Sequence, residues 1–293
     1  MTGRGRMGDR ILITGAEGML GRELTSKFLK EGYEVTPTDI AQLDINDSKA
    51  CLQYLEKTRA QIVINCAAYT LVDKAEEEPD KAMEVNGYAP GILAEAVKEA
   101  GSFLVHYSTD YVFDGTKEGF YLEDDAPSPL SMYGRSKLEG EKRIQASGCN
   151  FLIIRSEWLF GKLGNHFIRS IVKAASRMRY LEVVNDQIGS PTYAVDLAEA
   201  TELLIRKKAN GIVHFTSSGV TSWYDFTKLI FGELGIEKEI RPITSDELNR
   251  PAKRPRNSKL DGSKYIHITG QIPPAYDDAL QRYLKTGDLE KVN

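Results

Sequence analysis

The chain has 293 residues, of which 41% are hydrophobic, and a formal net charge of -4 with both signs spread along its length. This length suffices for one large domain or two lobes, the charge balance speaks against a nucleic-acid-binding face, and the apolar runs are too short to span a membrane. The 3 cysteines and 4 histidines follow no spacing pattern, which predicts no disulfide framework, no metal site and a reducing, cytoplasmic location.

The first nine residues lack an apolar core and predict a leader or start-site extension rather than a secretory signal. The stretch Arg10–Gly21 then predicts a strand, a tight turn and a helix over Met19–Lys30. Gly15 permits the turn, Gly18 lets the backbone approach a pyrophosphate, and Gly21 lets helix and strand pack closely. With Met19 and Leu20 in the first helical turn, the N-terminus predicts a dinucleotide site. The alternative is a structural turn without a ligand.

The second predicted strand, Glu34–Asp39, ends in an acidic residue. Asp39 can accept hydrogen bonds from an adenosine ribose, which favours NAD over NADP because a carboxylate repels a 2′-phosphate. The alternative is an ordinary loop aspartate. Asp44 and Ile45 come next and are expected beside the adenine, before a helix that Asn46 or Asp47 caps.

Apolar strands continue to alternate with helices as far as residue 155. The strand Gln61–Ala68 ends in Ala67 and Ala68, small residues that would let a cofactor lie against the backbone, with Tyr69 directly after them. The further expected elements are helices over Ala75–Val85 and Ala89–Ala100, and strands over Phe103–Ser108 and Asn150–Arg155. Such a pattern predicts an α/β fold with a doubly wound parallel sheet.

The pattern changes after residue 155. We expect a dinucleotide-binding domain over 1–155 and a smaller substrate-binding lobe over 156–293, with segments within 180–216 returning to the main sheet. The expected elements there are helices over Asn165–Arg177, Val195–Lys207 and Tyr224–Leu234, and strands over Leu181–Val184 and Gly211–Phe215.

Candidate catalytic residues follow the fourth strand. Thr109 ends that strand, and Tyr133 and Lys137 share one face of a later helix because they are four residues apart. A cationic neighbour lowers the pKa of a phenol, so Tyr133 is expected to act as a general acid or base, with Thr109 bonding the substrate oxygen. The same spacing recurs at Tyr224 and Lys228, which have no preceding strand with a hydroxyl and are interpreted as a helix-surface pair.

Longer motifs resemble a known family. They comprise the glycine turn from Gly15 to Gly21, Asn65–Thr70 with Val72–Glu76, Ser108–Gly115, Tyr133-Gly134 with Lys137-Leu138, Arg155 with Trp158, Asn185–Gln187 with Pro191-Thr192, and Arg254-Pro255 with Asn257-Ser258. The chain resembles the extended short-chain dehydrogenase/reductase family and is most similar to its dTDP-4-dehydrorhamnose reductase branch over nearly its whole length.

That resemblance implies a reaction and a set of contacts. NADH or NADPH would reduce the C4 ketone of a dTDP-4-keto-6-deoxyhexose to give dTDP-L-rhamnose, with Tyr133 as proton donor and Lys137 also on the nicotinamide ribose. The implied substrate contacts are Val72, Thr109, Asp110, Trp158 and Arg254. For Trp158 the alternative is core packing, and for Arg254 it is a salt bridge or structural clamp rather than the diphosphate. The expected partner is this small-molecule nucleotide sugar, with a homodimer as one option.

Other functions stay open. Related 4,6-dehydratases follow the strand-four Thr with Asp-Glu, whereas this chain has Asp110-Tyr111, which disfavours dehydration. A 4-epimerase, another deoxysugar ketoreductase or a regulatory subunit without turnover remain alternatives. Two residues depart from the pattern of the family that the chain resembles. Glu17 lies within the glycine turn and is expected to face solvent, and Glu157 stands where relatives carry a small or polar residue.

Overall fold

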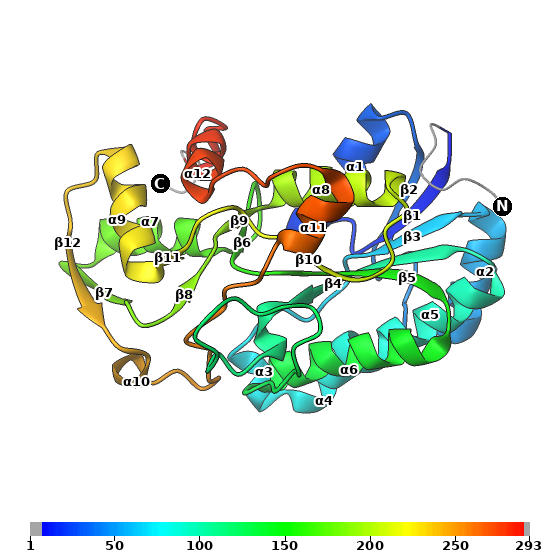
Figure 1. Cartoon of the computed structure of the whole chain (residues 1–293), viewed down its shortest axis with the longest axis horizontal. Helices are drawn as coiled ribbons and strands as arrows, with labels where there is room; N and C mark the ends of the chain where they lie inside the picture. Colours follow the sequence, from blue (N-terminus) through cyan, green and yellow to red (C-terminus); the bar gives the residue numbers. More distant parts are fainter. Residues whose placement is uncertain (1–7, 290–293) are drawn as a thin grey trace.

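Six of the apolar segments form one parallel sheet in a computed structural model that describes residues 8–289 (Figure 1). The strand order is β10-β5-β4-β3-β1-β2, and every neighbouring pair is parallel. The bounds are β1 (Arg10–Thr14), β2 (Glu34–Thr38), β3 (Ile62–Asn65), β4 (Phe103–Thr109), β5 (Asn150–Ser156) and β10 (Gly211–His214). The predicted leader falls outside the described residues except for its last two positions.

Helices cover both faces of this sheet, which confirms the predicted doubly wound fold. Because successive side chains of a strand point to opposite faces, Ile11 and Ile13 pack on one side and Leu12 on the other. The first side carries α1 (Met19–Lys30), α8 (Ala194–Arg206) and α11 (Ser263–Thr269). The second side carries α2 (Ser48–Thr58), α5 (Ala89–Glu99) and α6 (Met132–Ser147).

The strand order reverses next to β1. The chain steps from β1 to β2 on one side and then crosses to β3 on the other, so β1 and β3 are neighbours. In open α/β sheets ligands bind outside the carboxyl ends of the strands at this reversal point. The glycine turn that follows β1 therefore lies where a ligand is expected.

One predicted helix is interrupted. The segment expected as a helix over 75–85 forms α3 (Lys74–Glu77), α4 (Pro79–Met83) and a π-helical turn η1 (Glu84–Tyr88). Pro79 is the first residue of α4 and lacks the N–H that would continue α3. The wider turn then brings Asn86 into the buried interior beside α6.

The second lobe has its own core. Strand β7 (Tyr180–Val184) pairs in parallel with β12 (Glu239–Ile243), and the helices α7 (Phe167–Arg177), α9 (Trp223–Leu234) and α12 (Tyr276–Leu284) pack around Phe160, Phe226 and Tyr283. Within 180–216, β10 joins the main sheet whereas β7 stays in this lobe. The smaller elements are β6 (Leu159–Phe160), β8 (Ile188–Gly189), β9 (Thr192–Tyr193), β11 (Thr221–Ser222), α10 (Ser245–Leu248) and the 3-10 turn η2 (Asp110–Val112).

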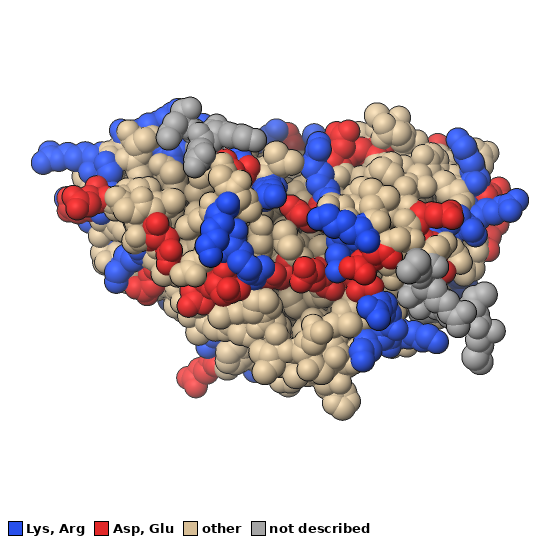
Figure 2. All heavy atoms as spheres, turned by 90° about the horizontal axis from the view of Figure 1, so that it is seen from above, with Lys and Arg blue, Asp and Glu red and all other residues tan. Residues whose placement is uncertain are grey.

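The surface over α12, α8 and α1 mixes acidic and basic side chains without a large patch of one sign (Figure 2). Among residues 8–289, no helix is long and apolar enough to cross a membrane. The same residues contain no group of three or more His, Cys, Asp or Glu placed to hold a metal ion.

Candidate active site

Three glycines with different surroundings build the turn between β1 and α1. Gly15 has a φ of 64°, and a Cβ there would lie 2.6 Å from the nitrogen of Ala67. A Cβ on Gly21 would lie 2.3 Å from the carbonyl oxygen of Gly15, so α1 can approach the turn only without a side chain at this position. A Cβ on Gly18 would meet only the Gly15 oxygen, at 3.3 Å. The turn is therefore open beside Gly18.

Helix α1 directs its N-terminus toward this opening. Gly18 is the N-cap, provides no side-chain cap, and the first turn holds no acidic residue. Leu20 is buried and anchors the turn in the core, while Met19 packs partly against it. The first N–H groups of the helix and its positive dipole end thus suit the pyrophosphate of a dinucleotide.

Asp39 ties the glycine turn to the end of β2. Its carboxylate oxygens accept hydrogen bonds from the backbone N–H of Ile40 at 2.9 Å and of Glu17 at 3.1 Å. The side chain of Glu17 is exposed, in agreement with its predicted direction. Asp44 is also exposed, whereas the side chain of Ile45 is buried in the core.

Small residues follow β3 across from the turn. The N–H of Ala67 donates to Oδ1 of Asn65 at 3.1 Å, and Ala67 and Ala68 are partly exposed. The side-chain amide of Asn86 bonds both the N–H and the carbonyl of Tyr69, at 2.8 and 2.9 Å. Two amide side chains therefore fix this backbone beside the glycine turn.

Thr109 and Tyr133 are brought together by β4 and α6. Tyr133 lies in the first turn of α6, where the Ser131 hydroxyl caps the helix by accepting from the Gly134 N–H at 3.2 Å. The Thr109 hydroxyl interacts with the phenol of Tyr133 and acts to lower its pKa. Burial and the negative charge of Asp110 raise the pKa of Tyr133 to about 12, and the opposing effect of Thr109 is smaller. Tyr133 therefore holds its proton at neutral pH.

The prediction that Lys137 lowers the pKa of Tyr133 is wrong, because this pKa is raised. The Nζ of Lys137 donates to the carbonyl of Tyr107 at 2.7 Å and lies 3.3 Å from Nε2 of His106. Burial lowers the pKa of Lys137 to about 8, and its charge is absent from the causes that set the pKa of Tyr133. The i, i+4 spacing correctly places both residues on one face, but it does not determine where the long lysine side chain ends.

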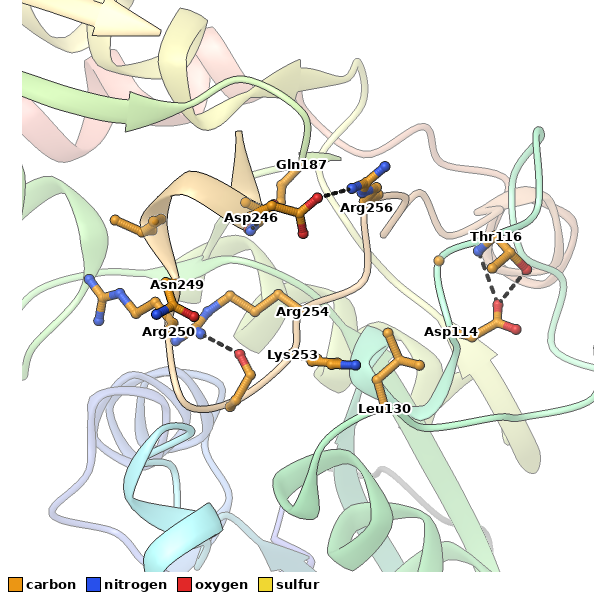
Figure 3. Close-up of a pocket in the computed structure, with 14 residues that line it drawn as sticks. Asp114, Thr116, Leu130, Gln187, Asp246, Asn249, Arg250, Lys253, Arg254 and Arg256 are labelled. Carbon is orange, nitrogen blue, oxygen red and sulfur yellow. Dashed lines mark hydrogen bonds and ion pairs between the residues drawn. The ribbon is translucent and has the colours of Figure 1, made fainter. Parts of the chain in front are cut away.

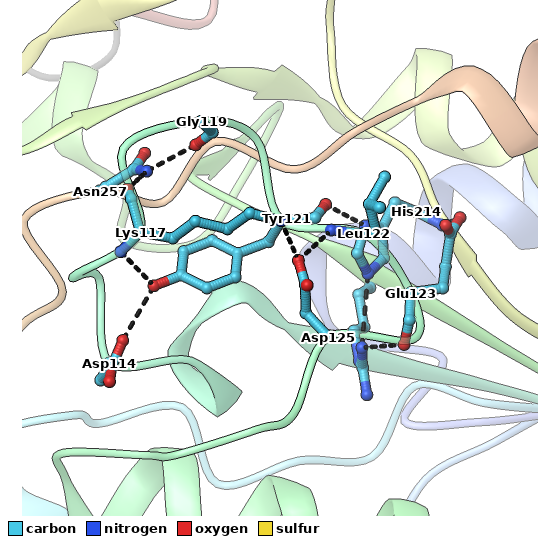
Figure 4. Close-up of polar contacts among 10 residues, drawn as sticks. Asp114, Lys117, Gly119, Tyr121, Leu122, Glu123, Asp125, His214 and Asn257 are labelled. Carbon is cyan, nitrogen blue, oxygen red and sulfur yellow. Dashed lines mark hydrogen bonds and ion pairs between the residues drawn. The ribbon is translucent and has the colours of Figure 1, made fainter.

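Asp110 lies beside Thr109 and is held from the other lobe. It accepts hydrogen bonds from the Thr109 hydroxyl at 3.0 Å and from the Ser258 hydroxyl. Burial raises the pKa of Asp110 to about 6 against these bonds. The segment that carries Ser258 is held by the loop shown in Figure 4. There the side-chain amide of Asn257 donates to the Gly119 carbonyl at 2.7 Å.

Glu157 is a buried acid next to this group. Its side chain is 2% exposed, and neither carboxylate oxygen has a hydrogen-bond partner of good geometry among the described residues. The β4–β5 register pairs Thr109 with Ser156, so Asp110 and Glu157 follow at adjacent strand ends. Burial first, and then the charge of Asp110, raise the pKa of Glu157 well above its usual range. It therefore faces inward beside Asp110, where burial favours its protonated form.

A cleft of about 730 Å³ lies beside these residues and is lined from both lobes. Val72 and Tyr111 line it from the first lobe, and the ring of Tyr111 packs edge-on against Tyr133 with centroids 5.5 Å apart. Trp223 lines it from the second lobe. Trp158, predicted as a sugar platform, stacks on Trp223 with centroids 3.6 Å apart. The volume suits a nucleotide-sized ligand.

Basic residues rim a neighbouring hollow (Figure 3) and comprise Arg250, Lys253, Arg254 and Arg256. Arg254 lines both this hollow and the cleft. Its guanidinium donates to both carboxylate oxygens of Asp73 at 2.9 Å and to the Ala252 carbonyl at 2.9 Å. Arg254 therefore connects the two lobes. Its guanidinium lies at the edge of the cleft, and its forked donors suit an anion there.

Several residues that shape this site carry no functional signal in the sequence pattern. Asn86 falls between two predicted helices, His106 lies within a predicted strand, and Trp223 comes directly before a predicted helix. The motif Asn257-Ser258 has no role in that pattern, although Ser258 bonds Asp110. A polar residue inside an otherwise apolar strand, such as His106, is the one signal that could have identified a member of this group.

The second Tyr-Lys pair lies outside the cleft. Lys228 is exposed, forms an ion pair with Asp225 at 3.4 Å and lies 5.2 Å from the ring centre of Tyr224. This arrangement agrees with the interpretation as a helix-surface pair.

Comparison with known proteins identifies the family. Residues 9–288 match the family model described as the RmlD substrate binding domain. A dTDP-4-dehydrorhamnose reductase from Aggregatibacter actinomycetemcomitans is 39% identical, covering 93% of this chain and 97% of that protein.

Solved structures agree. The dTDP-4-dehydrorhamnose reductase of Bacillus anthracis, in complex with NADP, has a TM-score of 0.92 at 35% identity and covers 96% of this chain and 100% of its own. The Clostridium acetobutylicum protein of the same description has a TM-score of 0.91 at 40% identity, covering 94% of this chain and 99% of its own. The chain therefore belongs to the RmlD substrate binding domain family, together with these dTDP-4-dehydrorhamnose reductases.

Proposed function

We infer that this protein is an NAD(P)H-dependent oxidoreductase that reduces the C4 ketone of dTDP-4-dehydro-6-deoxy-L-hexose (dTDP-4-dehydrorhamnose) to dTDP-L-rhamnose. The observation that carries this is the protonated phenol of Tyr133, which interacts with the Thr109 hydroxyl and packs edge-on against Tyr111, a lining residue of the nucleotide-sized cleft. Family membership and the NADP-bound structure of the Bacillus anthracis relative support it.

The cofactor has a fitting place in this chain, because the turn beside Gly18 is open and the N-terminus of α1 faces it. When bound, the reduced nicotinamide supplies the hydride. We propose that Asp39 bonds the adenosine ribose, that Asp44 and Ile45 lie at the adenine, and that Lys137 reaches the nicotinamide ribose. The remaining proposed contacts are Gly15, Gly18, Met19, Leu20, Gly21, Ala67, Ala68, Tyr69 and Tyr133.

Tyr133 is proposed as the proton donor. A phenol whose pKa is raised to about 12 keeps its proton at neutral pH, which is the form that a ketone reduction needs. The Thr109 hydroxyl would bond the ketone oxygen and orient it toward the Tyr133 hydroxyl. As the alkoxide forms, Tyr133 gives up its proton, and a charged Lys137 would stabilise the tyrosinate that remains.

The sugar nucleotide is proposed to occupy the cleft between the lobes. Val72 lines this cleft directly, Asp110 lies beside Thr109, and Trp158 supports the lining residue Trp223 from behind. Arg254 would meet the diphosphate while still bound to Asp73, because an arginine fork has further N–H donors. We further propose a cytoplasmic location, supported by three free thiols, and a homodimer, which light scattering would reveal as about twice the 32.7 kDa chain mass.

A coupled turnover assay tests the proposal. The 4-keto sugar nucleotide is generated in place, NADH or NADPH is added, and the product is identified by NMR. The substitution Tyr133→Phe should lower kcat by about 10²–10⁴-fold while the cofactor Kd stays within about 2-fold. Cofactor binding without turnover of this substrate would instead favour another deoxysugar ketoreductase or epimerase, and after that a regulatory subunit. Turnover that survives Tyr133→Phe would show that the proton comes from elsewhere.

A further inference from the structure

A chain of buried polar side chains links the end of β1 to Lys137, and Lys137 is its only member with a role in the reduction proposed above. The Thr14 hydroxyl donates to Oδ1 of Asn65 at 2.8 Å. Nδ2 of Asn65 lies 3.1 Å from Nδ1 of His106, and Nε2 of His106 lies 3.3 Å from Nζ of Lys137. All four side chains are buried, so each donor must meet an acceptor within the chain.

The hydrogen bond from Ala67 determines which way the chain runs. The backbone N–H of Ala67 can only donate, and it points at Oδ1 of Asn65 at 3.1 Å. The amide of Asn65 therefore turns Nδ2 toward His106 and donates to Nδ1 of the imidazole. Since a neutral imidazole carries one proton, that proton is on Nε2, which faces Lys137.

The orientation of His106 sets the protonation state that suits Lys137. An ammonium group has only donors, so a charged Lys137 would place N–H against the Nε2–H of His106. A neutral amine has a lone pair that accepts from Nε2–H and still donates to the Tyr107 carbonyl at 2.7 Å. Only the neutral amine satisfies both contacts.

The other titratable groups near Lys137 do not remove this preference. Glu141, one turn further along α6, favours the charged lysine, but its carboxylate is already paired with Arg155 at 2.7 Å. The thiol of Cys66 stays neutral because burial raises its pKa. In accord with the hydrogen-bond geometry, burial lowers the pKa of Lys137 to about 8 and holds the pKa of His106 well below its usual value.

We propose that His106 is a positioning residue that favours the neutral amine of Lys137 before the cofactor binds, so that cofactor binding takes up a proton at mildly alkaline pH. This rests on the proposed contact of Lys137 with the nicotinamide ribose. Ribose hydroxyls offer the lone pairs that Nε2–H of His106 does not, so Lys137 binds a proton from solvent as it leaves His106. The resulting cation would then lie where the tyrosinate of Tyr133 forms.

Calorimetry of NADPH binding in buffers of different ionisation enthalpy measures this proton uptake. With a lysine pKa of about 8, we expect about 0.9 proton per site near pH 9 and about 0.1 near pH 7. The substitution His106→Gln can turn an acceptor toward Lys137. The substitution Asn65→Asp accepts from both Ala67 and His106, which moves the histidine proton to Nδ1. Both variants should lose most of the uptake near pH 9, and unchanged uptake in a folded variant, or none in the parent protein, would overturn the proposal.

The tautomer of His106 is measured independently by ¹⁵N NMR of the histidine side chains. We expect the proton of His106 on Nε2. His214 is an internal reference of the opposite kind, because its Nδ1 lies 3.1 Å from the Tyr121 carbonyl and must donate to it. A proton on Nδ1 of His106 in the parent protein would refute the inference. Neither measurement uses the sugar nucleotide, so a failure of the proposed substrate is distinguishable from a failure of this proposal.

Discussion

Replacing Glu157 with Gln should stabilise the protein, and by a larger amount as the pH rises. The side chain is 2% exposed and its oxygens lack hydrogen-bond partners of good geometry among the described residues. Burial therefore favours the protonated acid in the folded state and raises its pKa well above the usual range. In the unfolded chain the same group ionises near its ordinary pKa of about 4.3.

The sign and size of this change in the free energy of unfolding follow from proton linkage. Between the two pKa values the folded protein holds a proton that the unfolded chain has released, so the free energy of unfolding falls by about 1.4 kcal/mol for each pH unit. This contribution of Glu157 is fully present below pH ~4.3 and is lost as the pH rises toward the folded pKa. Glutamine does not titrate, so the advantage of Glu157→Gln grows at the same rate. Asp110 titrates in both proteins, and its effect largely cancels in the difference.

Urea unfolding of the parent protein and the variant across pH 5–7.5 measures this difference. The exposed Glu237 provides a matched control, since Glu237→Gln makes the same chemical change at the surface and should give a small difference that varies little with pH. A difference between parent and Glu157→Gln that does not change with pH would show that Glu157 is ionised in the folded protein. A variant less stable than the parent near pH 7 would lead to the same conclusion.

Three further substitutions test the architecture of the site. Gly21→Ala places a Cβ 2.3 Å from the Gly15 carbonyl oxygen, so we expect a loss of about 1–3 kcal/mol in the free energy of unfolding and weaker cofactor binding, measured by urea unfolding and calorimetry. Arg254→Lys keeps the charge and loses the fork, which should raise the KM for the nucleotide sugar about tenfold; lower stability with an unchanged KM would indicate a clamp alone. Asp39→Asn keeps an acceptor and removes the charge, so the ratio of kcat/KM for NADPH to that for NADH should rise by about tenfold, and an unchanged ratio would exclude Asp39 as the selecting group.

Much of the fold could be predicted because its signals are local. The apolar runs that form β1, β3, β4 and β5 are buried on both faces, so each reads as a strand without knowledge of its neighbours. Helix α1 has the predicted bounds Met19–Lys30, since a glycine turn starts it and the apolar spacing continues through it. The interrupted helix after residue 74 is harder to predict. Pro79 gives a local signal, but the π-helical turn depends on the contact of Asn86 with Tyr69.

Only those parts of the candidate site that have a motif of fixed residue spacing could be predicted from the sequence. Motif spacing brings Thr109 and Tyr133 to one place, but the end point of Lys137 depends on His106, a contact between β4 and α6. The bond from Ser258 to Asp110 joins residues far apart in the chain. Such contacts follow from how the two lobes pack, and no periodicity in the sequence encodes them.

The titratable groups around Tyr133 share one property that bears on the direction of the reaction. Burial shifts the pKa of each of three groups toward its neutral form: that of Glu157 is raised, that of Asp110 is raised to about 6, and that of Lys137 is lowered to about 8. A buried site keeps the phenol protonated and strengthens the electrostatic interactions of any charge that later forms there. Ketone reduction starts from that protonated phenol, whereas alcohol oxidation would need the tyrosinate first. The burial that raises the pKa of Tyr133 therefore keeps this residue in the form from which reduction starts.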